Sequence, residues 1–585
     1  MKKIISLVLI TIMLLSLSAF ALEVENNECV KDAKWLIDKN DDGFFEVDLT
    51  KKSNSIKYNF KLFNELSDKQ NVKVIMGIYY DNVLSGVKAI SKSVESKKTT
   101  DNLTIGFDNL PDGTKENISV KVFVFFDGKT PVFTDKAEVL VSNNRNVAFG
   151  EDVNFKTVVA FMGDSITHIN PSYLKWIEYY YRIKYPTKDI KFVNKGISGD
   201  SAAGNEARFY WDILNDPNTG RTTEACLMIG MNDVNRRLYA NDEKGNDVGT
   251  EEAKQGAIDY CLTNISDISD LCEKEGVKLT LITPPVYDET EYTSTENMDG
   301  TNEALGKIAE GIIKIANERN LPYIDFYGSL NKYNDKIRSM DGFKKSATFN
   351  TPDRIHATDV GAFAEGFIFI SQQLKNILIA GTEIDVNNLS VDTDSAEVTD
   401  VTYKNDVLTY IYAPKSLPMY VTDEYKTMEQ KYGIPVTESI NREIIKVSGL
   451  RDGNYKLMIG DAELGIYSSE DLEKGVNIAT NPENPGYIQS EAVYNLVTKK
   501  MGYDASLRNI AYVERNLVKS VDLKDVGACI VYLKANYADS TDTRYIAYPD
   551  NKKAQKETVK NIKELEKEMV EKAKPGVYTV KIIKQ

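Results

Sequence analysis

Four short segments of the chain carry residues whose types and spacing suit nucleophilic chemistry. They are GDSIT at Gly163–Thr167, NKGISGD at Asn194–Asp200, GMND at Gly230–Asp233 and DRIH at Asp353–His356. Together they supply a serine hydroxyl, an aspartate–histidine pair, a side-chain amide and a glycine N–H. The chain has two histidines in 585 residues, so a histidine three residues after an aspartate is a strong candidate for a general base.

Each of these groups has a distinct chemical task. Ser165 follows a strand pattern and opens a helix pattern, which places its hydroxyl and N–H where developing negative charge is favoured. His356 would take the serine proton, and Asp353 would orient the imidazole and stabilise its charged form. The Ser165 and Gly199 N–H groups and the Asn232 amide would bind an oxyanion. We therefore predict a catalytic triad of Ser165, Asp353 and His356 with these three oxyanion donors.

The same residues have simpler interpretations, which stay open. Ser165 suits a helix N-cap, and Asp353 with His356 suits a surface capping pair. Gly199 suits a tight turn. Gly196 is a rival oxyanion donor, and Asp359 is a rival acid three residues after the histidine.

Other polar residues near the segments are given supporting roles. Ser198 and Ser201 lack the strand-to-helix setting that a nucleophile needs. His168 is expected at the surface or along a cleft. The remaining candidates are supporting or capping residues, Asn194 and Asp233, and pocket-rim contacts, Arg236, Arg237 and Tyr239.

Strands and helices alternate around the four segments. Short apolar strand patterns lie at Val158–Met162, Lys191–Asn194, Ala225–Ile229, Val277–Ile282 and Tyr323–Phe326. Helix patterns follow at Tyr173–Lys184, Glu251–Lys274, Glu303–Arg319 and Val360–Leu378. This alternation predicts a parallel sheet with helices on both faces, in which ligands bind beyond the carboxyl ends of the strands. The first three segments fall at such ends.

The four segments resemble blocks I, II, III and V of the SGNH (GDSL-type) hydrolases. Ser165, Gly199, Asn232 and His356 match the letters of the family name, and Asp353 matches its triad acid. The resemblance covers roughly residues 157–380. It implies a flavodoxin-like three-layer α/β/α fold and esterase or lipase-type activity without a metal or cofactor.

The sequence departs from the family pattern at two positions, Arg354 inside DRIH and Ala357 after it, where proline is frequent. Neither change removes a catalytic group. The GxSxG elbow of the α/β-hydrolases is absent, so that fold is not favoured.

The regions that flank the hydrolase domain differ from it in pattern. We predict a signal peptide at 1–21, an N-terminal β-sandwich at 22–150, the hydrolase domain at 151–380, a small β domain at 381–475 and a mostly helical extension at 476–585. The extension contains a charged helix at Asn551–Lys574 and a last strand at Val577–Ile583. An uncleaved N-terminal anchor is the alternative to a signal peptide. After cleavage, no remaining run is apolar enough to span a membrane.

Composition limits the classes of ligand and partner that we expect. The formal net charge of −15 at pH 7 disfavours nucleic acid. Five scattered cysteines make no disulfide framework. The stretch Asp38–Gly43 imitates the start of a calcium loop but lacks the bidentate acid at position twelve, so we expect a solvated turn and no metal site, with a divergent calcium site as the alternative.

These features lead to a functional hypothesis. The β-rich flanks resemble those of carbohydrate esterases, so we expect a secreted, periplasmic or cell-surface serine esterase that cleaves acyl, above all acetyl, esters on carbohydrate. The alternatives are a lipase, lysophospholipase or thioesterase of the same family, and a non-catalytic carbohydrate-binding surface protein. Acyl transfer to a glycan instead of water is a further possibility.

Overall fold

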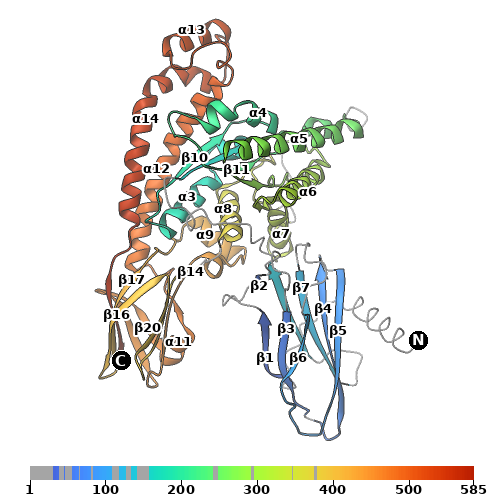
Figure 1. The fold of residues 1–585 in the computed structure, drawn as a ribbon, viewed down its shortest axis with the longest axis vertical. Coiled ribbons are helices and arrows are strands. Elements are labelled where there is room, and N and C mark those ends of the chain that lie inside the picture. The colour runs from blue at the N-terminus through green and yellow to red at the C-terminus, as the bar shows by residue number, and fades with distance from the viewer. Residues whose placement is uncertain are drawn as a thin grey trace, which may run out of the picture. The chain divides into compact units, whose positions relative to one another are not determined.

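The computed structural model describes twelve stretches of the chain, which are residues 30–37, 45–46, 56–64, 66–80, 83–107, 118–126, 133–140, 157–241, 248–290, 295–344, 347–374 and 378–585. The predicted signal peptide, the Asp38–Gly43 stretch and Cys29 lie outside them. The chain forms two compact units, Met1–Arg145 and Asn146–Gln585, and each is described by itself (Figure 1).

The first unit consists of two β-sheets around a shared apolar core. One sheet has the order β1-β3-β6, with β1 at Val30–Ile37, β3 at Ile56–Leu62 and β6 at Leu103–Phe107. The other has the order β2-β8-β7-β4-β5 and is formed by Phe45–Glu46, Phe133–Leu140, Ile118–Phe126, Gln70–Tyr80 and Val83–Val94. Alternate residues of both sheets, such as Tyr58, Val74 and Val122, meet in one buried cluster. Period-two patterning produces this arrangement, because successive side chains of a strand point to opposite faces.

The second unit is organised around a parallel five-stranded sheet with the order β10-β9-β11-β12-β13. The strands span Thr157–Gly163 (β9), Ile190–Gly196 (β10), Glu224–Met228 (β11), Lys278–Ile282 (β12) and Tyr323–Ile324 (β13). Numbered along the chain, this order is 2-1-3-4-5, the flavodoxin-like arrangement. The predicted fold class is confirmed.

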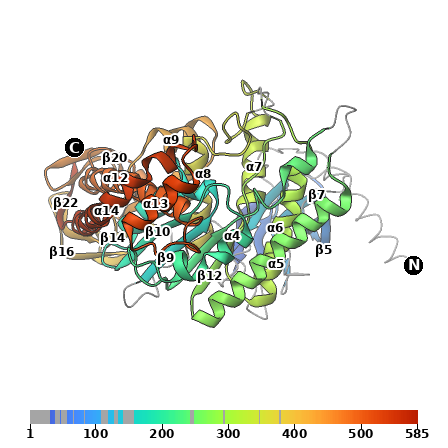
Figure 2. The same cartoon turned by 90° about the horizontal axis from the view of Figure 1, so that it is seen from above.

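Helices cover this sheet on both faces. They are α2 (Ser165–His168), α3 (Tyr173–Lys184), α4 (Ala202–Ala207), α5 (Glu251–Glu275), α6 (Thr301–Arg319), α7 (Phe326–Ser339) and α8 (Asp359–Gln373). The connection from β9 to β10 through α3 runs toward one edge of the sheet. The connections through α4, α5 and α6 run toward the other edge, to β11, β12 and β13. Because such crossovers are right-handed, α3 lies on one face of the sheet and α4, α5 and α6 lie on the other. Helices α3 and α8 pack together, as do α5 and α6. Both views show α5 and α6 on the side of the domain away from the C-terminal helices (Figures 1 and 2).

Residues beyond the hydrolase core form two further sheets. One has the order β15-β14-β18-β21, from Ser390–Asp394, Leu378–Asp385, Arg442–Ser448 and Val476–Asn477. The other has the order β16-β17-β22-β19-β20, from Ala396–Lys404, Val407–Pro414, Tyr578–Lys584, Asn454–Ile459 and Ala462–Ser468. The last strand, β22, lies between β17 and β19. The helical stretch predicted from residue 476 is therefore enclosed by strands of the same small β region.

Three long or medium helices make up that stretch, α12 (Pro485–Glu514), α13 (Val526–Asn536) and α14 (Thr543–Ala573). Short helical segments precede them at Phe209–Leu214 (η1), Arg236–Tyr239 (η2), Asp423–Lys426 (α9), Thr427–Lys431 (η3), Val436–Ile440 (α10) and Ser469–Lys474 (α11). Helix α14 begins eight residues before the predicted Asn551, and it contains Pro549. Helix α8 ends at Gln373, before the predicted Leu378, which instead begins β14.

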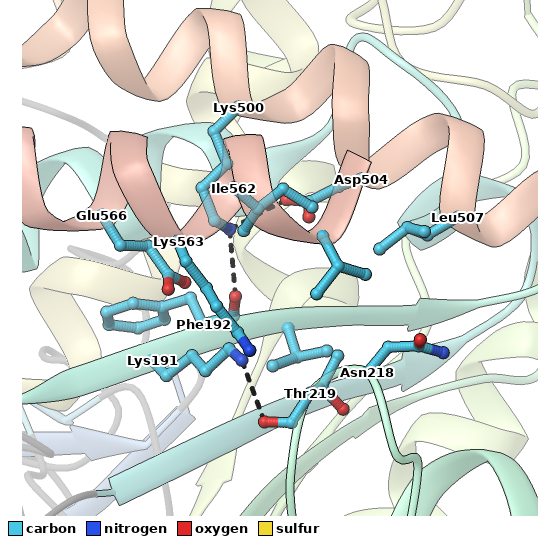
Figure 3. Close-up of a pocket in the computed structure, with 12 residues that line it drawn as sticks. Lys191, Phe192, Asn218, Thr219, Lys500, Asp504, Leu507, Ile562, Lys563 and Glu566 are labelled. Atoms are coloured by element: carbon cyan, nitrogen blue, oxygen red, sulfur yellow. Dashed lines mark hydrogen bonds and ion pairs between the residues drawn. The ribbon is translucent and has the colours of Figure 1, made fainter. Parts of the chain in front are cut away.

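Helix α12 lies along strand β10 and covers this edge of the central sheet. Lys500 Nζ donates to the Phe192 carbonyl at 3.1 Å, as Figure 3 shows, and Arg508 Nε donates to the Gly196 carbonyl at 3.1 Å. Eight helical residues rise about 12 Å and four strand residues about 13 Å, so the two spacings match. Within the described part of the chain, no helix is long and apolar enough to cross a membrane.

Candidate active site

Ser165 lies at the junction between the central strand β9 and helix α2. Gly163 ends the strand, and a Cβ there would lie 2.3 Å from Thr167 Oγ1 and 2.7 Å from the Met228 carbonyl, so only glycine allows this close turn. Asp164 caps the helix by accepting from the Ile166 N–H at 2.9 Å. The serine hydroxyl therefore sits at a helix start, at the carboxyl edge of the sheet, as its sequence setting predicted.

Ser165, His356 and Asp353 form a continuous hydrogen-bonded chain. Ser165 Oγ is 2.8 Å from His356 Nε2, and His356 Nδ1 is 2.5 Å from Asp353 Oδ2. Asp359 is exposed at the start of α8, and no contact joins it to the imidazole among the described residues. The structure thus brings together the three predicted triad residues and selects Asp353 over the rival acid.

The acid–base loop, which we define as Phe349–Thr358, is held mainly by its own hydrogen bonds. Asp353 Oδ1 accepts from the Ile355 and His356 N–H groups at 2.9 Å and from the Thr351 hydroxyl at 2.8 Å. Burial alone would raise the pKa of Asp353, but the hydrogen bonds from His356, Ile355 and Thr351 outweigh it and lower the pKa. The carboxylate is consequently ionised, as an acceptor for an imidazolium must be.

Arg354 has a structural task that the sequence did not reveal. Its backbone φ is +71°, its side chain is buried, and its Nη1 donates to the Asp288 carbonyl at 2.9 Å. Its own carbonyl accepts from the Asp288 N–H at 2.9 Å and from Asn350 Nδ2 at 2.8 Å. This departure from the family pattern therefore ties the acid–base loop to the segment that follows β12.

The oxyanion loop, which we define as Asn194–Asp200, turns sharply at Gly199. The Asp200 N–H donates to the Ile197 carbonyl at 3.0 Å, and Gly199 has a φ of +73°, which favours glycine at this turn position. The Gly199 and Ser165 N–H groups have no acceptor within the described stretches. Both are thus available for a substrate oxygen.

Asn232 lies beside these two donors and is held in place. Its Nδ2 donates to the Asp200 carbonyl at 2.9 Å and, at a long 3.4 Å, to Asp164 Oδ2. Burial, with the charges of Asp233 and Asp200 added, raises the pKa of Asp164 to about 7 despite the opposing bond from Ile166. A large part of the Asp164 population is therefore neutral near pH 7, which reduces repulsion of any negative charge nearby.

Gly196, the rival donor, is committed elsewhere. Its N–H donates to Asn194 Oδ1 at 2.9 Å. A Cβ on Gly196 would lie 2.5 Å from the backbone nitrogen of His168, so the glycine permits strand β10 to approach helix α2. Asn194 also donates from Nδ2 to the Thr167 carbonyl at 2.7 Å. This pair therefore supports the site by fixing β10 against α2.

A buried charge network beneath the oxyanion loop was not predicted from the sequence. Asp200 Oδ2 accepts from Arg208 Nε at 2.7 Å, and Arg208 Nη1 reaches Asp212 Oδ2 at 2.6 Å. Arg508 of α12 makes two bonds to the same Asp212 carboxylate, at 2.8 and 2.7 Å. Burial alone would raise the pKa of Asp212, but Arg508, Lys195 and Arg208 hold it well below its ordinary range.

Helix α12, the first helix of the C-terminal extension, thereby contacts the oxyanion loop of the predicted active site. Arg508 joins the network to the Gly196 carbonyl, and Arg515 Nη1 lies 3.5 Å from the Ser198 carbonyl. The sequence separation of about three hundred residues left no local signal for these contacts.

The other residues singled out in the sequence are a helix cap, hydrogen-bonding side chains, an exposed arginine and a buried tyrosine. Ser201 caps α4 through its hydroxyl, and Asp233 Oδ1 accepts from the Ala202 N–H at 2.8 Å. Arg236 donates to the Met231 carbonyl, and burial lowers its pKa. Arg237 is exposed, whereas Tyr239 is buried under Lys254 and is not a rim residue.

His168 is buried, and of its two expected positions, the surface or a cleft, it takes the second. Its Nδ1 accepts from the Ser198 N–H at 3.0 Å and faces the Ser198 hydroxyl at 2.9 Å. Burial, followed by the charges of Arg508 and Arg544, lowers the pKa of His168 to about 3. His168 is therefore a neutral hydrogen-bond acceptor and not a second base.

The thiol of Cys261 is buried and hydrogen-bonds with Asp233. Cys226, Cys261, Cys272 and Cys529 are buried and free. Across the described stretches, no group of histidine, cysteine or acidic side chains is arranged to hold a metal ion.

Comparison with known proteins agrees with this geometry. Residues 161–362 match the GDSL-like Lipase/Acylhydrolase family, so this part of the chain belongs to the SGNH hydrolases. The chain is therefore an acylhydrolase that acts on esters. No curated protein shows a significant match.

Among solved structures, a gut microbial diltiazem-metabolizing enzyme is similar at 22% identity and a TM-score of 0.64, over 74% of this chain and 98% of that one. The acetylxylan esterase Axe2 from Geobacillus stearothermophilus matches at 20% identity and a TM-score of 0.30, over 38% and 98% of the two chains. The acetyl xylan esterase AlAXEase matches at 22% and 0.29, over 37% and 100%. At such identities the first match shows a shared fold, which extends well beyond the family match.

Proposed function

We propose that this protein is an exported serine esterase that removes short acyl groups, above all acetyl, from carbohydrate. The observation that carries the proposal is the chain of contacts from Ser165 Oγ to His356 Nε2 and from His356 Nδ1 to Asp353, at 2.8 and 2.5 Å. A hydroxyl, a base and an orienting carboxylate in this order are what nucleophilic acyl transfer requires.

The first half of the reaction forms an acyl-enzyme. His356 Nε2 takes the Ser165 proton while Oγ attacks the ester carbonyl carbon. Asp353 accepts from Nδ1–H and stabilises the imidazolium that results. The same Nε2–H then gives its proton to the departing alcohol oxygen, and the ester C–O bond breaks.

The oxyanion of this step is bound by the Ser165 and Gly199 N–H groups and by Asn232. The long 3.4 Å contact between Asn232 Nδ2 and Asp164 is the one that a substrate oxygen would replace. Preorganised donors of this kind lower a barrier because they need not reorient as charge develops. The start of helix α2 adds its own partial positive charge.

The second half of the reaction returns the enzyme. Water enters where the alcohol left, and His356 Nε2 takes one of its protons as the oxygen attacks the acyl carbonyl. The proton then passes to Ser165 Oγ as the acyl–serine bond breaks. The products are a carboxylic acid and the free enzyme, without a redox step or a cofactor.

Two further parts of the proposal concern substrate and location. The proposal of a carbohydrate substrate is supported by the β-sheet regions that precede and follow the hydrolase domain in the sequence. Export is supported by the N-terminal sequence, in which Lys2 and Lys3 precede an apolar run that ends in Ala19-Phe20-Ala21. We place the mature protein outside the cytoplasm, in the medium, the periplasm or at the cell surface.

Hydrolysis of p-nitrophenyl acetate tests the chemistry. Wild type should turn over, Ser165→Ala should fall to background, and Ser198→Ala should retain activity as a matched control from the oxyanion loop. Equal turnover by wild type and Ser165→Ala would refute the nucleophile.

Release of acetate from a panel of acetylated polysaccharides, compared with hydrolysis of long-chain esters, tests the substrate. Preference for the long-chain esters would favour the lipase alternative. Formation of acylated product with a competing sugar acceptor would indicate acyl transfer.

A further inference from the structure

A polar cleft of about 370 Å³ lies beside the oxyanion loop. The hydrolase core contributes one wall, and helices α12 and α14 contribute the other. The lining includes His168, Asn170 and Ser198 from the core, and Asn509, Thr543 and Arg544 from the helices. The mechanism above uses none of these side chains.

The cleft adjoins the reacting groups. Ser198 directly precedes Gly199, whose N–H has no acceptor among the described residues and is assigned to the oxyanion above. His168 ends helix α2, which Ser165 begins, and three helical residues rise only about 4.5 Å. A substrate that holds its ester at Ser165 can therefore extend across the oxyanion loop into this cleft.

The charged side chains of the cleft are fixed before any ligand arrives. Arg544 donates from Nε and Nη2 to the Asp542 carboxylate at 2.9 and 2.7 Å. Its guanidinium also lies 3.6 Å from the ring centroid of Tyr512. The bond from Arg544 is the main reason that the pKa of Asp542 falls to about 2, so this pair stays charged and internally neutralised.

The other polar lining groups are uncharged and include both donors and acceptors. His168 is neutral, and because its Nδ1 accepts from Ser198, its ring proton lies on Nε2. Asn170, Asn509 and Thr543 add amide and hydroxyl groups. Ile169 and Ala505 are the apolar members of the lining.

Such a lining suits a neutral ligand rich in hydroxyl groups. A long acyl chain placed here would cover polar groups without replacing their hydrogen bonds, which is unfavourable. A carboxylate or phosphate would find Arg544 already paired with Asp542. Sugar hydroxyls both donate and accept, and so match amides, hydroxyls and a carboxylate together.

We propose that this cleft binds the sugar units next to the acylated one, so that the C-terminal helices select an oligosaccharide substrate. The proposal rests on the esterase function stated above and adds a site to it. The site lies in helices outside the hydrolase core, and it discriminates by the alcohol part of the ester and not by the acyl part.

The test compares a small ester with a ladder of esters on the same variants. The probes are p-nitrophenyl acetate and chemically acetylated xylo- and manno-oligosaccharides of one to six sugar units. In wild type, kcat/KM should rise with the number of sugar units for at least one ladder. Thr543→Trp, which places a bulky ring in the cleft, should lower kcat/KM for the longer esters about tenfold and leave p-nitrophenyl acetate within about twofold.

Two additional variants guard against misinterpretation. Ile546→Trp, at an exposed position three residues along α14, does not line the cleft and should behave as wild type. Asn509→Ala should raise KM for the longer esters about fivefold, as expected for a lost hydrogen bond of about 1 kcal/mol. Normal hydrolysis of p-nitrophenyl acetate by each variant shows that it is folded.

The outcomes separate the two proposals. No turnover of p-nitrophenyl acetate by wild type would refute the esterase function itself. Turnover of that ester with no gain along any ladder would refute the cleft, as would a Thr543→Trp effect that is equal for small and long esters or absent for both.

Discussion

The acid–base loop and the oxyanion loop of this site are held in place by different means. In the acid–base loop, Asp353 Oδ1 accepts from residues two or three positions away, and Thr351 N–H donates to the His356 carbonyl at 2.7 Å. The oxyanion loop is instead held by Arg208 and by Arg508, which comes from a helix 312 residues beyond Gly196. Local bonds and the Arg354–Asp288 contacts hold one half of the site within the hydrolase core, whereas the other half also bonds to the C-terminal extension.

This difference has a physical reason. A carboxylate that accepts hydrogen bonds from nearby residues orders a loop locally, and Arg354 then anchors this loop to Asp288. The carbonyls of an edge strand face outward and need donors from elsewhere, because buried polar groups without partners are costly. The C-terminal helix supplies these donors as Lys500 and Arg508.

The largest expected effect is on the acid–base loop. Asp353→Asn preserves the shape of the side chain but disfavours the imidazole tautomer and the imidazolium that catalysis needs, so kcat should fall about 10⁴-fold. Steady-state kinetics with p-nitrophenyl acetate would measure this loss. Asp359→Asn is the matched control and should be near wild type, and a loss of similar size in that variant would overturn the assignment of the acid.

Asn232→Ala tests the oxyanion side of the comparison. Removal of one oxyanion donor should lower kcat about 10²- to 10³-fold with little change in KM, because the donor acts mainly on the transition state. The same kinetic assay measures both constants. A variant in which KM rises and kcat is unchanged would assign Asn232 to substrate binding instead.

Arg508→Ala and Lys500→Ala form a matched pair on one helix. Each removes a buried cation that bonds to a carboxylate and to a carbonyl of β10. Each should cost about 3–5 kcal/mol of stability in thermal or denaturant unfolding. Only Arg508→Ala should also lower kcat, about 10- to 100-fold at a temperature where both variants are folded, because only Arg508 adjoins the oxyanion loop. Equal kcat values for the two variants would remove the proposed dependence on the extension.

The last effect is on the pH dependence of stability and concerns helix α8, which follows the acid–base loop. Burial raises the pKa of Glu365 from an ordinary 4.5 to about 8. The folded state therefore keeps a proton that the unfolded state loses, and stability present below pH 4.5 is lost as the pH rises toward 8. The slope for this group is at most about 1.4 kcal/mol per pH unit.

Melting temperatures of wild type and Glu365→Gln between pH 5 and pH 9 would show this titration. The variant should lose less stability than wild type over that range. Parallel curves for the two proteins would mean that Glu365 does not titrate as proposed.

The parts of the molecule predicted from sequence are those with local patterns. Strand β9 is an apolar run that ends at Gly163, and helix α3 has the predicted bounds Tyr173–Lys184. Ser165, His356 and Asp353 converge because parallel strands and their loops share one edge of the sheet.

The features that the sequence did not reveal depend on contacts between distant residues. Nothing near Arg508 or Arg544 distinguishes them from surface arginines of a charged helix. The positive φ of Arg354 and the enclosure of the helical extension by strand β22 likewise follow from tertiary packing. The strong break signal of Pro549 was overridden by the packing of α14 against α12.

Labelling with a serine-directed fluorophosphonate, followed by peptide mass analysis, tests whether Ser165 is the activated nucleophile. We expect a covalent label on the peptide that contains Ser165, absent in Ser165→Ala and formed far more slowly in His356→Ala. A label on Ser198 or Ser201, or labelling of Ser165→Ala as fast as wild type, would contradict it.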